Sequence, residues 1–139
     1  MRVLIDTNIL IDAAICRLPF CKDAQTIIKL CGEGKIDGFV AFHSLSNLFY
    51  ILRKEFSCEE RVKMISRFRT NMQTVVITNE MIDRALDNNS IKDLEDALQY
   101  VCAEEMNVDY IVTRDLKGYS GMPIKTVTAE QLLQLLESP

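Results

Sequence analysis

Two aspartates stand at positions where a parallel α/β sheet would bring chemical groups together. Asp6 directly follows the apolar run at 3–5, and Asp115 comes two residues after the apolar run at 109–113. In an open sheet of parallel strands, ligands gather beyond the carboxyl ends of the strands. We therefore expect the side chains of Asp6 and Asp115 to lie near each other at that end of the sheet.

Further acids lie on the helix predicted before the run at 109–113. Asp93 and Asp96 fall in its first turns, and Asp96 is on the polar side, opposite the apolar stripe of residues 94–101. Carboxylates that converge repel one another, and burying them together is costly unless a cation fills the space between them. Mg²⁺ and Mn²⁺ prefer oxygen ligands and keep several waters. The acids therefore predict a divalent-cation site suited to the hydrolysis of a phosphodiester.

Each acid also has a structural interpretation. A single aspartate after a strand is more often a turn or helix-cap residue than a ligand. Asp93, Glu95 and Asp96 would complement the positive end of a helix dipole. Any one acid taken alone favours this second interpretation, whereas Asp6 and Asp115 at two strand ends together favour the site.

The elements that must position these acids alternate along the chain. Short apolar runs predict strands at 3–5, 38–42, 74–77, 109–113 and 124–127. Stretches with helical spacing separate them, one opened by the capping box of Ser57 and Glu60, and Asn89 or Ser90 is the predicted cap of the helix that carries Asp96. Strands that are apolar on both faces and alternate with helices predict an α/β fold whose parallel sheet is covered on both sides.

The bulk composition limits the class of protein. The 139 residues suit one domain, and 48% of them are apolar, enough for a sizeable core. The start of the chain shows no cleavable signal, and no apolar run approaches the roughly 18 residues of a membrane span, so we expect a cytoplasmic protein without a membrane segment. Five cysteines without a Cys-x-x-Cys pair predict reduced thiols in the core. The net charge of −4 does not exclude a nucleic-acid substrate, because bound cations neutralise an acidic cluster.

Three segments resemble a known family. VLIDTNILID at 3–12 resembles the opening of PIN-domain nucleases, the family that includes VapC-type toxins, and DLEDAL at 93–98 and DYIVTRD at 109–115 resemble its later motifs in the right order and spacing. The resemblance covers nearly the whole chain. It implies one PIN-like domain over 1–139, built as a three-layer α/β/α sandwich with a mainly parallel sheet of about five strands. It also implies a ribonuclease dependent on Mg²⁺ or Mn²⁺.

The resemblance also implies roles for individual residues. The catalytic acids, which also bind the metal, would be Asp6, Asp96 and Asp115. Asp93 matches an extra acid of some members and ranks below Asp96 as a ligand. Thr113 would place a hydroxyl beside the metal, and Asn8 would steady the loop of Asp6.

Asn47 departs from the family pattern. In the segment SLSNL at 44–48, this amide stands where the family usually has a glutamate, its second acid. An amide oxygen can ligate a hard cation, but it supplies no negative charge and cannot act as a base. An equally good interpretation makes Asn47 a polar residue on a helix face. The resemblance thus predicts three acids and an amide, with weaker metal binding than four acids would give.

Candidate contacts for RNA are basic or aromatic. Arg114 is the basic residue most expected near the substrate, and Arg53 and Lys54 begin a stretch rich in positive charge at 53–69. A solvated helix surface is the competing interpretation of that stretch. The aromatic residues Phe42, Phe49 and Tyr50 have the spacing of core residues, and His43, the one histidine, is expected to be structural.

Three functions compete at this stage. The leading one is a metal-dependent endoribonuclease that forms the toxin half of a toxin–antitoxin pair, held inactive by a small antitoxin and assembled as a homodimer. The second is a degenerate PIN domain that binds RNA or protein without cutting, which Asn47 would favour. A phosphatase with Asp6 as the nucleophile ranks last, because that class usually has an aspartate at the position of Asn8.

Overall fold

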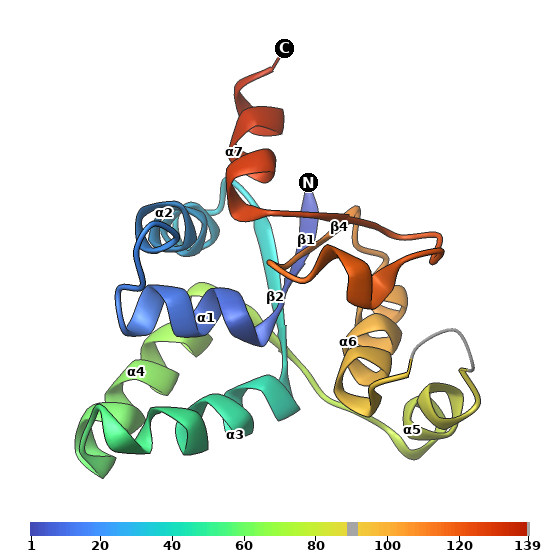
Figure 1. Ribbon diagram of the computed structural model, residues 1–139, viewed down its shortest axis with the longest axis horizontal. Coiled ribbons are helices and arrows are strands. Elements are labelled where there is room, and N and C mark those ends of the chain that lie inside the picture. The colour runs from blue at the N-terminus through green and yellow to red at the C-terminus, as the bar shows by residue number, and fades with distance from the viewer. Residues whose placement is uncertain (89–91, 139) are drawn as a thin grey trace.

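A central sheet of parallel strands carries helices on both faces (Figure 1). The computed structural model describes residues 1–88 and 92–138. The strands in these ranges are β1 (Arg2–Ile5), β2 (Asp37–Ala41), β3 (Gln73–Val75), β4 (Tyr110–Val112) and β5 (Lys125–Val127). The α-helices are α1 (Thr7–Ala14), α2 (Cys21–Gly32), α3 (Phe42–Ile51), α4 (Cys58–Asn71), α5 (Asn79–Leu86), α6 (Leu94–Glu105) and α7 (Ala129–Glu137). Two short 3-10 helices are η1 (Leu52–Lys54) and η2 (Leu116–Tyr119).

The strand order places a topological switch point beside β1. The order is β3-β2-β1-β4-β5 and each neighbouring pair is parallel, with Leu4 of β1 opposite Phe39 of β2 on one side and Ile111 of β4 on the other. The chain first builds the sheet outward from β1 through β2 and β3, then returns to the other side of β1 to add β4. The carboxyl ends of β1 and β4 therefore border the switch point where such sheets bind ligands. The predicted α/β/α sandwich with a parallel five-stranded sheet is confirmed.

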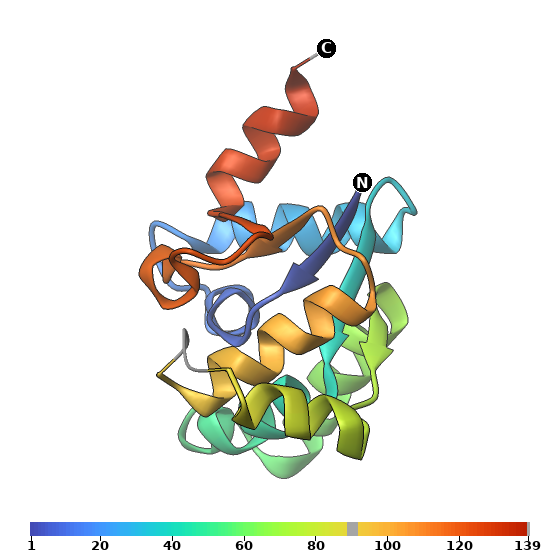
Figure 2. The ribbon, with the colours of Figure 1, turned by 90° about the vertical axis from the view of Figure 1, so that its right-hand side faces the viewer.

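Each face of the sheet has its own core. Val3 and Ile5 pack with α1, α2, α3, α4 and α7, whereas the intervening Leu4 packs on the opposite face with α5 and α6. This alternation is the ordinary consequence of the two-residue repeat of a strand. Figure 2 shows α5 and α6 in front of the sheet. No helix in the described ranges is long and apolar enough to cross a membrane.

Helix caps follow the sequence closely, with one difference that matters for the site. The predicted capping box of Ser57 and Glu60 is present at the start of α4. At the start of α6 the N-cap is Asp93, whose side chain accepts a hydrogen bond of 3.1 Å from the amide of Asp96. The predicted caps Asn89 and Ser90 lie outside the described residues. Asp93 thus has the structural role that was the alternative to metal binding.

The segment after β4 contains the short helix η2. Asp115 caps the 3-10 helix η2 by accepting a hydrogen bond of 3.2 Å from the amide of Gly118. This turn directs the side chain of Tyr119 into the protein, where only 2% of the residue is exposed. A four-residue helix gives too short a pattern for periodicity to reveal.

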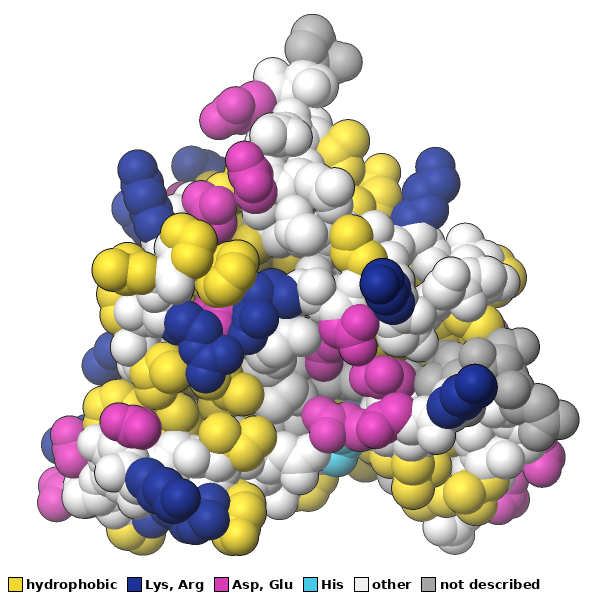
Figure 3. Space-filling model, viewed as in Figure 1, with side chains coloured by type: hydrophobic (Ala, Val, Ile, Leu, Met, Phe, Trp, Pro, Cys, Tyr) yellow, Lys and Arg dark blue, Asp and Glu magenta, His cyan; other side chains and the backbone are white. Residues whose placement is uncertain are grey.

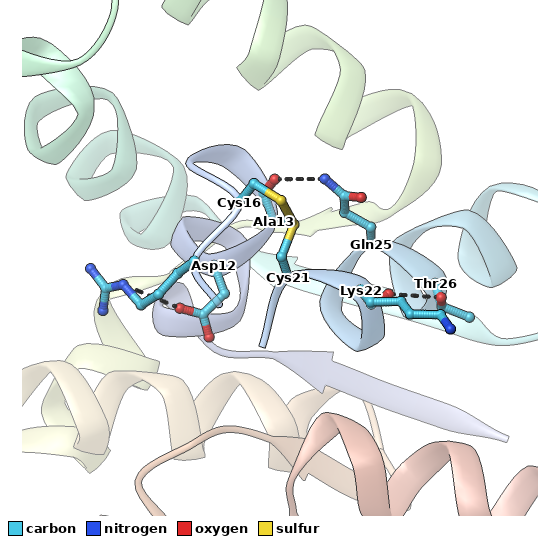
Figure 4. The surroundings of a disulfide bond; sticks show 8 residues. Asp12, Ala13, Cys16, Cys21, Lys22, Gln25 and Thr26 are labelled. Atoms are coloured by element: carbon cyan, nitrogen blue, oxygen red, sulfur yellow. Dashed lines mark hydrogen bonds and ion pairs between the residues drawn. A yellow bond between two sulfur atoms is a disulfide. The ribbon is translucent and has the colours of Figure 1, made fainter. Parts of the chain in front are cut away.

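The cysteines correct another prediction. Cys16 and Cys21 form a disulfide, and Cys16 and Cys58 are exposed, so the prediction of five reduced core thiols is wrong. Cys31 and Cys102 are buried and free, as predicted. Figure 4 shows the disulfide linking the turn after α1 to the first residue of α2. The positive φ of 51° at Cys16 closes that turn, and the two Cα atoms lie 4.6 Å apart.

Candidate active site

Asp6 is the first residue after β1 and the N-cap of α1. Only 6% of the residue is exposed, and each carboxylate oxygen accepts two hydrogen bonds. Oδ1 accepts from the amide of Thr7 (2.7 Å) and from Nε2 of Gln99 (3.0 Å). Oδ2 accepts from the hydroxyls of Thr113 (2.8 Å) and Tyr119 (3.2 Å). Burial raises the pKa of Asp6 above its usual value, although these four donors oppose the shift.

Asp96 and Asp115 reach the same place from α6 and from the turn after β4. The hydroxyl of Tyr119 lies between Oδ2 of Asp6 and Oδ1 of Asp96, 3.4 Å from the latter. A Cβ atom added to Gly118 would lie 2.8 Å from Oδ2 of Asp96 and 2.8 Å from Oδ2 of Asp115. The missing side chain of Gly118 therefore leaves a space bordered by two carboxylates. The structure brings the three acids to one end of the sheet.

Negative charge is concentrated around Asp96. Partial burial, followed by the charges of neighbouring acids, raises the pKa of Asp96 to about 6; these neighbours are Asp6, Asp93, Asp115 and Glu95. Figure 3 shows acidic side chains gathered near the middle of one face of the molecule. Such mutual repulsion is what a bound cation would relieve.

Thr113 and Asn8 tie the two strand ends together. The hydroxyl of Thr113 donates to Asp6 and accepts from Nδ2 of Asn8 (3.1 Å) and from the amide of Asp115 (3.0 Å). Oδ1 of Asn8 in turn accepts from the amide of Arg114 (3.2 Å). These contacts fix the turn that carries Asp115 against the start of α1.

Sequence reasoning missed a buried polar network behind Asp6. Gln99 is fully buried in α6 and donates to Asp6 and to the hydroxyl of Ser44 (2.6 Å), which lies 2.9 Å from the hydroxyl of Thr7. One signal for Gln99 was present, because it follows Asp96 by three residues and therefore shares its side of the helix. Ser44 begins the segment SLSNL that resembles the family pattern, whereas the sequence offers no comparable signal for Tyr119.

Comparisons with known proteins identify the family. The model of the PIN domain matches residues 2–117. The chain belongs to the PIN-domain family. Ribonuclease VapC1 of Aquifex aeolicus (strain VF5) is similar to the chain, with 23% identity over 137 residues that cover 96% of this chain and 94% of the relative.

Solved structures share the fold of this PIN domain. One is a toxin–antitoxin complex from Klebsiella pneumoniae, with a TM-score of 0.69 and 20% identity over 91% of this chain and 97% of that chain. Another is VapBC2 from Rickettsia felis bound to a DNA fragment from its promoter, with a TM-score of 0.71 and 15% identity over 92% of this chain and 98% of that chain. At these identities the likeness shows the fold.

The side chains of this PIN domain fit a hard divalent cation. The donors are carboxylate oxygens, and the space at Gly118 borders two of them. In the described part of the chain, Oε1 of the fully buried Gln99 has no hydrogen-bond partner. Within the described residues, no three acidic, histidine or cysteine side chains are close enough as they stand to enclose an ion. The hydroxyl of Tyr119 lies between Asp6 and Asp96 and hydrogen-bonds to both.

Asn47 and Asp93 do not join the three acids directly. Asn47 is half-buried on α3, and its side chain makes no hydrogen bond to any residue that the structure describes. It lies three residues after Ser44 and therefore on the same side of α3. Asp93 is exposed, and its Oδ1 is used in capping α6. Both were predicted as weaker candidates for metal binding than the three acids.

Arg114 lies in a structural ion pair. Its Nε and Nη2 donate to the carboxylate of Asp12 over 2.6 Å and 3.1 Å, and the Asp12 side chain is fully buried. The guanidinium also stacks 4.7 Å from the centre of the Phe20 ring. Arg17 approaches the same carboxylate at 3.8 Å. Two donor groups of Arg114 are thus occupied by the protein itself.

The remaining predicted residues lie around α3. Arg53 and Lys54 are exposed in η1, beyond the carboxyl end of α3, whereas Ser44 at its other end contacts the network of Asp6. Ten helical residues span about 15 Å, so these cations are separated from the acids by the length of the helix. His43 is half-buried with both ring nitrogens unpaired, and burial lowers its pKa to about 4. It is therefore neutral near pH 7.

The aromatic residues of α3 do not all pack in the core as expected. Phe42 and Tyr50 are 60% and 62% exposed, and Phe49 is half-buried under the guanidinium of Arg61. The ring of Tyr50 stacks on Arg53, 3.8 Å from the guanidinium carbon. The buried stripe of α3 is instead made by Leu45 and Leu48.

Proposed function

We propose that this protein is a divalent-metal-dependent endoribonuclease that hydrolyses RNA phosphodiester bonds as the toxin of a toxin–antitoxin pair. The carrying observation is the meeting of Asp6, Asp96 and Asp115 around the space at Gly118, in a chain of the PIN-domain family. The names of its relatives, a ribonuclease and toxin–antitoxin complexes, support the same function. We further propose that residues 1–139 act as one domain.

The chemistry follows from how the side chains are held. The three acids would hold Mg²⁺ or Mn²⁺, and such an ion activates water and stabilises negative charge on a phosphodiester. Thr113 and Gln99 keep the carboxylate of Asp6 in one orientation through hydrogen bonds. Burial and two neighbouring carboxylates raise the pKa of Tyr119, so its hydroxyl stays protonated and remains a donor to Asp6.

Substrate and partners belong to the same proposal. Arg114, Arg53 and Lys54 remain the proposed contacts for RNA phosphates, and Arg114 has Nη1 left for this purpose. Solved relatives that are toxin–antitoxin complexes support a small antitoxin as the inhibitor of this site. We propose that the protein forms a homodimer and works in the cytoplasm, where its substrate RNA is found.

Asn47 supports a second candidate, a degenerate PIN domain that binds RNA or protein without cutting it. The side chain of Asn47 carries no charge and makes no hydrogen bond within the described chain. A site with one acid fewer holds a cation less tightly, because each carboxylate contributes to the attraction. The two candidates differ in one measurable property, the cleavage of RNA.

Cleavage of mixed-sequence RNA by the purified protein, freed of any antitoxin, tests the proposal. We expect products with Mn²⁺ or Mg²⁺ and none after chelation. Asp115→Asn should abolish cleavage, whereas Asp109→Asn should retain it, because these two exposed aspartates stand at opposite ends of β4. No cleavage with any of several metals would favour the non-catalytic candidate, and equal loss in both variants would contradict the site.

Gly118→Ala should weaken cation binding with little effect on folding. The new methyl group would lie 2.8 Å from a carboxylate oxygen of Asp96 and 2.8 Å from one of Asp115, closer than real Cβ atoms approach, so both side chains must move apart. Both contacts are ends of flexible side chains, so we expect stability to change by less than about 1 kcal/mol. Titration calorimetry should show Mn²⁺ affinity about tenfold lower; unchanged affinity would place the cation elsewhere.

The affinity for Mn²⁺ should depend on pH through Asp96. Its pKa of about 6 in the metal-free protein means that below this pH the cation must displace a proton from the carboxylate. The apparent Kd is therefore expected to rise by up to about tenfold for each pH unit below 6 and to level off above it. Calorimetry at several pH values measures this, and Asp96→Asn should lose the step near pH 6. A step retained in that variant would assign it to another group.

A further inference from the structure

Glu95 is a half-buried acid in the first turn of α6, two residues after the N-cap Asp93. Its Oε1 lies 3.1 Å from the hydroxyl of Thr7, the residue directly after Asp6. Its charge is also one of those that raise the pKa of Asp96, its neighbour on α6. Glu95 therefore contacts the residue that follows Asp6, and it directly precedes Asp96 in the sequence.

Hydrogen bonds connect the side chain of Glu95 with that of Asp6. Gln99 has two amide hydrogens, of which one serves Asp6 and one serves the hydroxyl of Ser44. The hydroxyl of Thr7 lies within donating distance of Oγ of Ser44, at 2.9 Å, and of Oε1 of Glu95, at 3.1 Å. Glu95 thus ends a hydrogen-bond network that leads through Thr7, Ser44 and Gln99 to Asp6.

Two observations apart from the acids indicate a ligand among them. Oε1 of the fully buried Gln99 has no hydrogen-bond partner among the residues that the structure describes, and the same amide bonds to Asp6 through its nitrogen. Buried polar atoms are rarely left unpaired without a bound water or ion nearby. The second observation is the space at Gly118 between the carboxylates of Asp96 and Asp115.

Position on the fold connects Glu95 with Asn47. The hydroxyl of Thr7 joins Ser44 of α3 to Glu95 of α6, and Asn47 lies one helical turn after Ser44 on the same side of α3. Glu95 thus faces the region between α6 and α3 into which an acid at position 47 would extend. Among the described residues, the hydroxyl of Thr7 is the one hydrogen-bond partner of the Glu95 side chain.

We propose that Glu95 is the fourth acid of the cation site and supplies from α6 the negative charge that Asn47 does not supply from α3. The inference rests on the proposed function in that it concerns the same cation. It assigns to Glu95 a direct or water-mediated contact with the ion, with Thr7 as the donor that positions its carboxylate. Groups one shell away from a metal commonly change its affinity by ten- to a hundredfold.

The test is Mn²⁺ binding by titration calorimetry, with RNA cleavage measured in parallel. Glu95→Gln should lower the Mn²⁺ affinity about tenfold or more. Glu104→Gln removes an equal charge from the same helix, at an exposed position paired with Arg84, and should leave the affinity unchanged. Adding Asn47→Glu to Glu95→Gln should recover most of the lost affinity, because it returns an acid to the site from the other helix.

Each result separates this inference from the proposed function. Wild-type affinity in Glu95→Gln, or equal losses in Glu95→Gln and Glu104→Gln, would overturn the role of Glu95 while cleavage by the native protein still stood. Mn²⁺ binding that depends on Glu95, in a protein that cuts no RNA, would support this inference and overturn the function. Should Glu95→Gln fold poorly by circular dichroism, Glu95→Asp is measured in its place. It keeps the charge but shortens the side chain that reaches Thr7, so the Mn²⁺ affinity should fall, and native affinity would overturn the role of Glu95.

Discussion

Asp6→Asn is expected to lower the rate of RNA cleavage about a thousandfold or more while the protein remains folded. Removing a carboxylate that holds the cation costs several kcal/mol of transition-state stabilisation, and about 4 kcal/mol corresponds to a thousandfold in rate. The fold should tolerate the change because of the donors around Asp6. Oδ1 faces two fixed N–H groups, but Oδ2 faces the hydroxyls of Thr113 and Tyr119, and the Tyr119 hydroxyl can turn toward Asp96 and accept from an amide.

The matched control for this variant is Asp37→Asn. Asp37 is an exposed aspartate in the same sheet, at the amino end of β2. The Asp37→Asn variant should therefore cut RNA at the native rate. Single-turnover cleavage of one RNA and thermal unfolding of both variants measure the two properties separately. Cleavage that persists unchanged in Asp6→Asn would remove the central acid from the assignment, and unfolding of that variant would show that Asp6 acts on stability.

The sheet was predictable because strand and helix signals in this chain are local. The runs at 3–5 and 124–127 are short and apolar, and Ser57 with Glu60 marks a helix start on its own. The order of the strands gave the site its place, since Asp6 and Asp115 follow strands that neighbour each other across the switch point. Phe42 was assigned to a strand but begins α3, because an aromatic residue at an element boundary suits both.

The inner network was not predictable, since it depends on which side chains meet across elements. The hydrogen bond from Gln99 to Ser44 joins residues 55 positions apart, and no local sequence pattern predicts a contact between them. Tyr119 is buried only because Asp115 folds the following residues into η2. The disulfide of Cys16 and Cys21 likewise depends on the turn after α1, in which Cys16 itself has a positive φ.

Asp12→Asn is expected to destabilise the protein by about 3 kcal/mol, the largest effect on folding that we foresee from a single polar substitution. The Asp12 side chain is fully buried, and it accepts two hydrogen bonds from Arg114, at 2.6 Å and 3.1 Å. Removing one partner of a buried ion pair leaves the other charge uncompensated, which typically costs 3–5 kcal/mol. We use the lower value because Arg114 is 28% exposed and keeps some hydration.

A double-mutant cycle shows whether the pair itself is responsible. Asp12→Asn with Arg114→Gln should be less destabilised than the sum of the two single variants, because neither charge is then left alone. Glu33→Gln is the control, since its ion pairs with Lys29 and Lys35 are exposed and should contribute under about 1 kcal/mol. Urea unfolding measures the native protein and these four variants. Strict additivity would mean that Arg114 is free of Asp12 in solution, and its guanidinium would then be fully available to RNA.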